Sequence, residues 1–149
     1  MADATLVYNS KVKAYDLAVA SGDLLTGDDL KNAVLISLFS WARADEGETD
    51  ASSPRYGWWG DLFADTPLGS KLYLLRRAKI TPETLMRARE YILDALSWMV
   101  RDGVAADVSA DVSRSSFDLL RVDAVVTITR PDNATESVRF TDLWSFIAQ

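Results

Sequence analysis

Residues 56–103 read YGWWGDLFADTPLGSKLYLLRRAKITPETLMRAREYILDALSWMVRDG, and this stretch decides the fold. It begins with two adjacent tryptophans, Trp58 and Trp59, which stand between Gly57 and Gly60. The two rings carry a very large apolar area, and the glycines free the backbone to bend. We therefore expect this turn to be a structural anchor, with at least one of the two rings largely buried.

The second half of the stretch has the signals of a long helix, which we place at about residues 82–102. Thr81 suits the N-cap, Pro82 suits the first helical position, and Gly103 follows the last turn. A set of apolar residues recurs at helical spacing and predicts one buried face: Leu85, Ala88, Ile92, Leu96 and Met99.

Two further helices are predicted on weaker signals. One covers about residues 67–78, because Thr66 and Pro67 have the form of a cap followed by a proline at the first helical position, and leucines follow. The other covers about residues 28–44, where apolar residues again repeat at helical spacing: Leu30, Val34, Leu38 and Trp41.

Three side chains break the pattern of the long helix. Tyr91 and Trp98 lie seven residues apart on its polar side, where a solitary domain rarely places two large aromatic rings. Either the tryptophan-rich loop or a strand folds over them, or they contact a protein partner. Arg89 projects from the apolar stripe and is a third expected anchor. Unless its head reaches solvent it requires a carboxylate, for which Asp61 and Asp65 are the candidates.

The periodicity after the long helix is that of strands. Alternating apolar and polar residues over 104–113 and again over 121–129 predict two strands that each bury one face. Val138 and Phe140, with Trp144 as a further candidate, predict a third strand. Turn-forming residues separate the three segments, so we expect a small antiparallel sheet.

A short hairpin is predicted near the N-terminus. Residues 15–19 alternate, residues 21–23 have turn chemistry, and residues 24–25 begin a return. The brief apolar run within residues 1–13 is compatible with either a strand or an arm. Helices packed on a C-terminal antiparallel sheet make the expected fold class α+β, and the length indicates a single domain over residues 1–149.

The composition excludes several classes of function. The 149 residues include no histidine and no cysteine, which rules out Ser-His-Asp and Cys-His catalysis, thiolate zinc sites and disulfides. A net charge of -6 argues against nucleic-acid binding. The longest apolar run, residues 33–36, is far too short to cross a membrane, and the N-terminus lacks the pattern of a signal peptide. We therefore expect a protein that works or is assembled in the cytosol.

Residues 45–54 form an acidic stretch without apolar periodicity, which we interpret as an exposed loop whose order is left open. Its acidic residues do not have the spacing of an EF-hand, and no glutamate closes the loop. We therefore expect no metal site and no cofactor.

Several motifs together resemble the phage Mu-type tail protein family, a branch of the gpW-like baseplate wedge proteins of contractile tails. That branch is more distantly similar to the lysozyme-like wedge subunit of T-even phages. The resemblance covers about residues 17–144 and is carried by these segments: Asp28–Phe39, Gly57–Asp61, Gly69–Leu75, Thr81–Leu85, Ala88–Tyr91 and Asp102–Val104.

The resemblance implies a structural virion protein of the tail baseplate, assembled in the host cytoplasm and present in six copies per baseplate ring. Its implied partners are the larger wedge proteins and the tail sheath, whose first ring it would help to start. Strand addition at the C-terminus is the implied contact mode, and off-face aromatics together with an apolar terminal strand suit a subunit held in an assembly. The predicted interface residues are Tyr91, Trp98, Val138, Phe140, Trp144 and Phe146.

Two other functions compete with this interpretation. One is a soluble tail assembly chaperone or adaptor, which leaves the mature particle and would therefore be missing from purified tails. A lysozyme-like glycoside hydrolase needs a glutamate in an apolar setting beside an ionised partner. Glu83 and Glu90 lie on the polar helix face and Glu136 lies by a turn, so none fits, and we expect no catalytic residue and no enzymatic activity.

Overall fold

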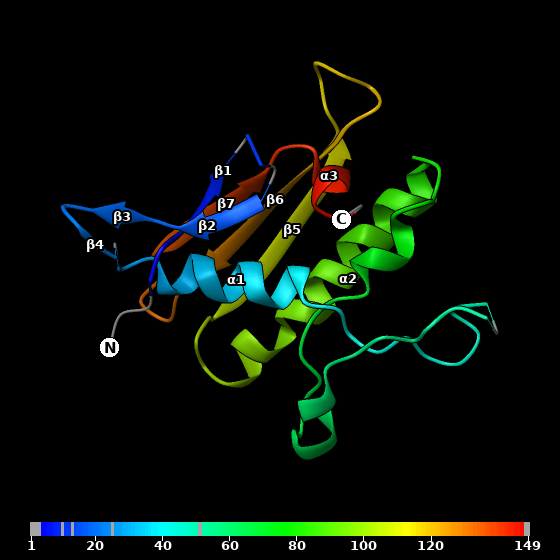
Figure 1. The fold of residues 1–149 in the computed structure, drawn as a ribbon, viewed down its shortest axis with the longest axis horizontal. Coiled ribbons are helices and arrows are strands. Elements are labelled where there is room, and N and C mark those ends of the chain that lie inside the picture. The colour runs from blue at the N-terminus through cyan, green and yellow to red at the C-terminus, as the bar shows by residue number, and fades with distance from the viewer. Residues whose placement is uncertain (1–3, 10, 13, 25, 51, 148–149) are drawn as a thin grey trace. The chain divides into compact units, whose positions relative to one another are not determined.

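The computed structural model describes residues 4–9, 11–12, 14–24, 26–50 and 52–147 (Figure 1). The chain divides into two compact units, Met1–Ile36 and Ser37–Gln149, and each is described by itself below. The α+β class predicted from the sequence is confirmed, because both units combine helical segments with antiparallel strands. That residues 1–149 form one domain stays a prediction.

The first unit is built from two short hairpins and the first turns of a helix. Strands β1 (Leu6–Asn9) and β2 (Ala14–Leu17) pair antiparallel, as do β3 (Val19–Ala20) and β4 (Asp23–Leu24). The predicted turn at residues 21–23 is that of the second hairpin, but the expected first arm, residues 15–19, lies mostly in β2, which pairs with β1. Leu25, at the end of the expected return, lies outside the described residues. At the tip of the second hairpin Ser21 and Gly22 both have positive φ, which is what a two-residue turn with the right twist requires.

A buried asparagine joins the N-terminal strand to α1 (Asp29–Phe39). The Asn32 side chain accepts a hydrogen bond from the Leu6 N–H at 3.2 Å and donates one to the Ala4 carbonyl at 2.6 Å. Both polar ends of the amide are therefore satisfied by backbone groups, as a buried amide requires. Residues 6–9, for which the sequence left a strand or an arm open, are a strand.

Helix α1 ends at Phe39, five residues before the predicted end at residue 44. The following residues are extended and pair with a segment 30 residues further on. Ala42 N–H donates to the Ser70 carbonyl at 3.0 Å, and Ser70 N–H donates to the Ser40 carbonyl at 2.9 Å. The Ser70 hydroxyl also donates to the carbonyl of Leu38 in the last turn of α1, so polar groups at and after the helix end are satisfied by tertiary partners rather than by further helix.

The second unit contains a three-stranded antiparallel sheet in the order β5-β6-β7. Its strands are β5 (Asp107–Arg114), β6 (Val122–Thr129) and β7 (Thr135–Phe140), close to the predicted positions. The register pairs Val112 with Ala124 and Val126 with Val138, so the alternating apolar residues share one face. The central strand is the best buried, with its four inward residues fully covered: Val122, Ala124, Val126 and Ile128.

The long helix α2 (Pro82–Arg101) packs against β5, as Figure 1 shows. Its predicted start is confirmed: the Thr81 hydroxyl accepts a hydrogen bond from the Thr84 N–H, and Pro82 occupies the first position. The predicted apolar stripe is also confirmed, since most of it lies in the core: Ala88, Ile92, Leu96 and Met99.

Two other predicted elements are wrong. The helix expected at 67–78 is reduced to one 3-10 turn, η2 (Leu72–Leu75), because Gly69 has positive φ and Ser70 pairs with the extended segment after α1. The third strand does not extend to Trp144. It stops at Phe140, Asp142 has positive φ, and a short helix α3 (Leu143–Ile147) follows, with Leu143 and Ile147 buried. None of the helices in the described part of the chain combines the length and apolar character needed to cross a bilayer.

Candidate partner-binding surface

An aromatic cluster of three rings lies where the segment after α1 meets η2. The rings of Trp41 and Tyr56 are 4.5 Å apart, those of Tyr56 and Tyr73 5.3 Å, and those of Trp41 and Tyr73 5.5 Å. The Tyr73 hydroxyl donates to the Ala42 carbonyl at 2.8 Å, and burial raises the pKa of this phenol. Tyr73 thus fixes the cluster, while Trp41 and Tyr56 remain accessible at its rim.

Three grooves open around Tyr56, which lines all of them. Their volumes are about 300, 530 and 310 Å³. The largest groove, which we call the tryptophan cleft, runs between residues 42–45 and the turn 57–62. Concave surfaces with aromatic walls are the usual places where proteins accept a ligand or the side chain of a partner.

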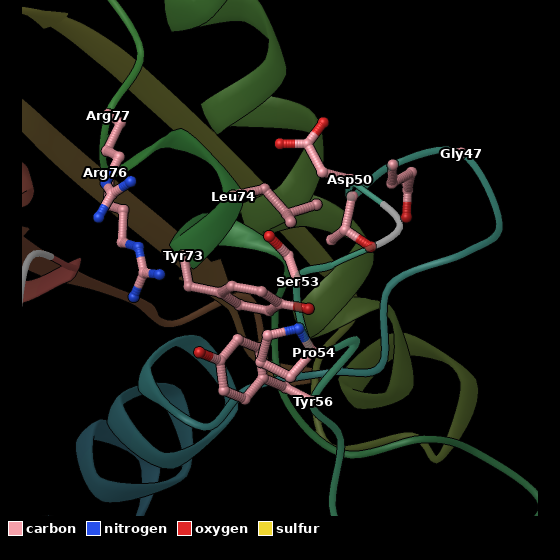
Figure 2. A pocket seen from close by; sticks show the side chains of 11 residues that line it. Gly47, Asp50, Ser53, Pro54, Tyr56, Tyr73, Leu74, Arg76 and Arg77 are labelled. Atoms are coloured by element: carbon pink, nitrogen blue, oxygen red, sulfur yellow. The ribbon is translucent and has the colours of Figure 1, made fainter.

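The groove in Figure 2 has walls of opposite character. Residues 47–50 with Ser53 and Pro54 form one side, and Arg76 and Arg77 lie on the other. The loop that contains residues 47–50 is held in place by Lys71, whose ammonium group contacts Asp45 at 2.6 Å and Glu48 at 2.9 Å. The hydrogen bond from Lys71 lowers the pKa of Asp45. The described part of the acidic stretch therefore has defined contacts, although its side chains are largely exposed.

The tryptophan turn differs from its prediction. Its 3-10 helix η1 (Trp59–Phe63) leaves Trp58 47% exposed and Trp59 72% exposed, so the expectation that one ring is largely buried is wrong. The following apolar residues are more exposed still, Leu62 at 83% and Phe63 at 84%. The turn carries its large apolar area outward. The Trp58 ring packs locally over Gly60, and its centroid lies 5.5 Å from that of the Trp59 ring.

Asp61 stabilises the base of this turn. Its Oδ1 accepts a hydrogen bond from the Leu68 N–H at 2.9 Å, while Oδ2 is buried and has no hydrogen-bond partner among the described residues. The expected pairing of Arg89 with Asp61 or Asp65 is wrong. Arg89 Nε donates instead to the Ala110 carbonyl on β5 at 2.9 Å, with its exposed guanidinium at the helix edge.

The off-face aromatics of α2 are half-buried. Trp98 Nε1 donates to the Ser37 hydroxyl at 3.0 Å, so the last turn of α1 covers part of this ring. Burial, and next the carboxylate of Glu48, raise the pKa of Tyr91. Both rings are thus partly covered within the chain, but the element that contacts Trp98 is the last turn of α1 and not the tryptophan-rich loop or strand that was expected. A partner contact at their exposed edges stays a prediction.

The C-terminal candidates fall into two groups. Phe140 is 1% exposed, because it packs against Phe39 and Phe146, so it is a core residue and is not available to a partner. Val138, Trp144 and Phe146 are half-buried. The Trp144 indole Nε1 is buried without a hydrogen-bond partner among the described residues.

A second exposed apolar segment was not identified from the sequence. In the loop between β5 and β6, Phe117, Leu119 and Leu120 are all exposed, and Phe117 is 99% exposed. Apolar residues directly after the turn Arg114–Ser116 were a usable signal, because they fit neither strand pattern. Among the described residues no cluster of acidic side chains has the arrangement of a metal site.

The chain is similar in sequence to known phage proteins. A family model described as "Phage protein GP46" matches residues 30–135. The chain is 39% identical over 127 residues to the "Baseplate protein gp46" of Escherichia phage Mu, an alignment that covers 84% of this chain and 86% of the relative. It is 41% identical over 131 residues to the "Mu-like prophage FluMu protein gp46" of Haemophilus influenzae, covering 87% and 90%.

Proposed function

Because the chain belongs to the GP46 family of phage proteins, we propose that it is a structural subunit of the baseplate of a phage or phage-like tail. The observation that carries this proposal is the similarity to the Mu protein named as a baseplate protein, which extends over most of both chains. The family-model match includes the tryptophan turn, α2 and the paired strands β5 and β6.

The finer role that we propose is that of a wedge subunit in a contractile tail. It would be present in six copies, bind larger wedge proteins and help to start the first ring of the sheath. The exposed apolar segments 58–63 and 117–120 support such a role, because a free monomer rarely exposes this much large apolar surface without using it. The half-buried residues Val138, Trp144 and Phe146, with Tyr91 and Trp98, stay part of the proposed interface.

A non-enzymatic role is part of the same proposal. The chain has no histidine or cysteine to act as base or nucleophile near neutral pH. The carboxylate with an unpaired buried oxygen, Asp61, hydrogen-bonds the backbone at Leu68 through its other oxygen, which is a structural use. Peptidoglycan hydrolysis by the purified chain, abolished by substitution of one carboxylate, would contradict this part.

Purified particles provide the test of the function. Tails are to be isolated from a host expressing the tail genes that accompany this chain, and the chain is to be quantified and located in them by mass spectrometry and electron cryomicroscopy. We expect density for it in the baseplate, in six copies. Finding the chain only in assembly intermediates would favour a chaperone, and its deletion leaving sheathed, complete baseplates would contradict a structural role.

A further inference from the structure

Four large apolar side chains are exposed within six consecutive residues of the tryptophan turn: Trp58, Trp59, Leu62 and Phe63. With about 150–250 Å² for each large side chain, their exposed fractions correspond to roughly 500 Å². That area is comparable to the largest apolar patch of a typical monomer, about 300–600 Å². It would also supply much of the roughly 800 Å² that each partner contributes to an interface of standard size.

The turn is held in one conformation by its own contacts. The Trp58 ring lies over Gly60, where an added Cβ would come within 2.3 Å of it. Asp61 N–H donates to the Trp58 carbonyl at 3.1 Å, and the Asp61 carboxylate accepts the Leu68 N–H. A segment that is already ordered loses little conformational entropy when it docks. The exposed rings are therefore presented in a form suited to binding.

The tryptophan cleft adjoins the exposed rings. Its volume is about 530 Å³, and Trp58, Trp59, Leu62 and Pro67 contribute to its walls. The walls also include the charged residues Arg43, Arg55 and Lys71, but most of the exposed lining is apolar. A protruding apolar turn beside such a cleft lets one partner segment cover the rings and place a side chain in the cleft. Hot spots of interfaces have this arrangement, with aromatic side chains packed beside a desolvated pocket.

The charges around the turn indicate what kind of partner fits. Residues 57–66 contain Asp61 and Asp65 and no lysine or arginine. Three nearby cations form ion pairs within the chain: Lys71 with Asp45 and Glu48, Arg55 with Glu46, and Arg101 with Asp102. A fourth cation, Arg43, lies beside Gly57 at the base of the turn. Two copies joined through this turn would bring carboxylates of like charge together, which disfavours self-association.

We propose that the tryptophan turn docks onto a different baseplate protein, through an apolar segment of that partner which inserts a large side chain into the tryptophan cleft and carries lysine or arginine at its rim. The inference rests on the proposed baseplate function and identifies one contact through which that function is carried out. It reassigns Trp58 and Trp59 from anchors of the fold to residues of an interface.

The test uses the full chain in its particle. The double variant Trp59→Ser/Phe63→Ser removes exposed rings from the turn, and Met86→Ser/Val104→Ser removes exposed apolar side chains of the same unit elsewhere. Each is expressed in place of the wild-type chain with the accompanying tail genes, and the amount of chain per purified particle is measured. We expect the turn variant to be reduced about tenfold or more, while the control is incorporated like the wild type.

Three further measurements decide between outcomes. Circular dichroism and light scattering of the free variants establish whether they are folded monomers, and hydroxyl-radical labelling compares Trp59 and Phe63 in free wild-type chain and in particles. Protection of both rings in particles supports the proposal even if the turn variant does not fold. Equal labelling in both states, normal incorporation of the folded turn variant, or an equal loss in the control would overturn it.

Two other outcomes would also overturn it and are distinguishable from these. A dimer of the free wild-type chain that the turn variant dissociates would make a second copy the occupant. Absence of the wild-type chain from particles would refute the proposed function itself. Normal incorporation of the turn variant, in contrast, would leave the baseplate function standing and remove only the docking contact.

Discussion

Residues 56–80 and residues 81–103 are neighbours in the chain and have similar sequence signals, yet only the second segment folds as an α-helix. Each contains a Thr-Pro dipeptide followed by regularly spaced apolar residues, Thr66-Pro67 in one and Thr81-Pro82 in the other. In the second, Thr81 caps α2. In the first, the chain makes the two 3-10 segments η1 and η2, and Ser70 between them pairs with the segment after α1.

The difference lies in what each segment meets. Helix α2 lies along β5 and buries a continuous apolar stripe, so helical hydrogen bonds and core burial favour the same conformation. The first segment meets the chain at residues 40–44, where the backbone groups of Ser40 and Ala42 form hydrogen bonds with the backbone of Ser70. A similar Thr-Pro signal thus precedes different structures, because tertiary partners outweigh a capping preference of about 1 kcal/mol.

A leucine-to-alanine substitution should affect the free energy of unfolding most strongly in α2 and very little in the tryptophan turn. Leu96 is fully buried on α2, whereas Leu62 on the tryptophan turn is exposed. Leu96→Ala should lower the free energy of unfolding by about 2–5 kcal/mol, through lost burial and a residual cavity. Leu62→Ala should change it by less than about 0.5 kcal/mol. Urea unfolding followed by circular dichroism measures both, and equal losses would contradict the described exposure of the turn.

A smaller effect is expected at the two Thr-Pro dipeptides. Thr81→Ala removes the acceptor of the Thr84 N–H and should cost about 1 kcal/mol, and Thr81→Ser should restore most of it. Thr66 caps no helix, and its hydroxyl accepts only an exposed hydrogen bond from Arg101. We therefore expect Thr66→Ala to cost less than about 0.5 kcal/mol. A loss at Thr66 as large as at Thr81 would mean that the first segment has a capped helix after all.

Features fixed by local periodicity could be predicted from the sequence, and features fixed by distant contacts could not. The α2 stripe and the β6 alternation were predictable because each residue's burial follows from the periodicity of its own element. The 3-10 turn at Leu72–Leu75 was not, because Ser70 is held extended by a segment some 30 residues away. For the same reason, nothing local indicated that Phe140 and Phe146 would pack on Phe39.

For the candidate surface, the sequence indicated which large apolar residues are present but not whether they are exposed. Two adjacent tryptophans between glycines indicated that their apolar area must be covered, but the sequence does not state whether the covering group belongs to the same chain. The structure leaves both rings substantially exposed, and Gly57 before them has a positive φ, which favours glycine. The aromatic cluster at Trp41 and Tyr73 joins residues more than 30 positions apart, which periodicity cannot detect.

The two tryptophans of the turn should differ in how much they contribute to the stability of the free chain. Trp59→Ala in the free chain should change the free energy of unfolding by less than about 0.5 kcal/mol, because the ring is mostly exposed. Trp58→Ala should cost more, since its ring covers Gly60. Thermal unfolding of the two single variants gives the order. A loss of about 3 kcal/mol for Trp59, as for a buried ring, would restore the anchor role.

The smallest effect is expected from pH, and it concerns the acidic loop that borders the grooves. The hydrogen bond from Lys71 lowers the pKa of Asp45 below its ordinary value of 3.8. A carboxyl whose pKa is lowered in the folded state stabilises that state above its ordinary pKa, and this contribution is lost as pH falls through the lowered value. Wild-type chain should therefore have a slightly higher thermal midpoint than Asp45→Asn at about pH 6, and the two should converge as the pH falls below 3.8 and through the lowered pKa of Asp45. High salt should also reduce the difference, because Asp45 is exposed and its charge is screened.

Thermal unfolding at several pH values measures this difference in midpoint. Asp50→Asn is the control, since Asp50 lies in the same loop and has no ion pair within the described residues. A difference that is constant across this pH range would show that Lys71 does not stabilise the loop through the charge of Asp45.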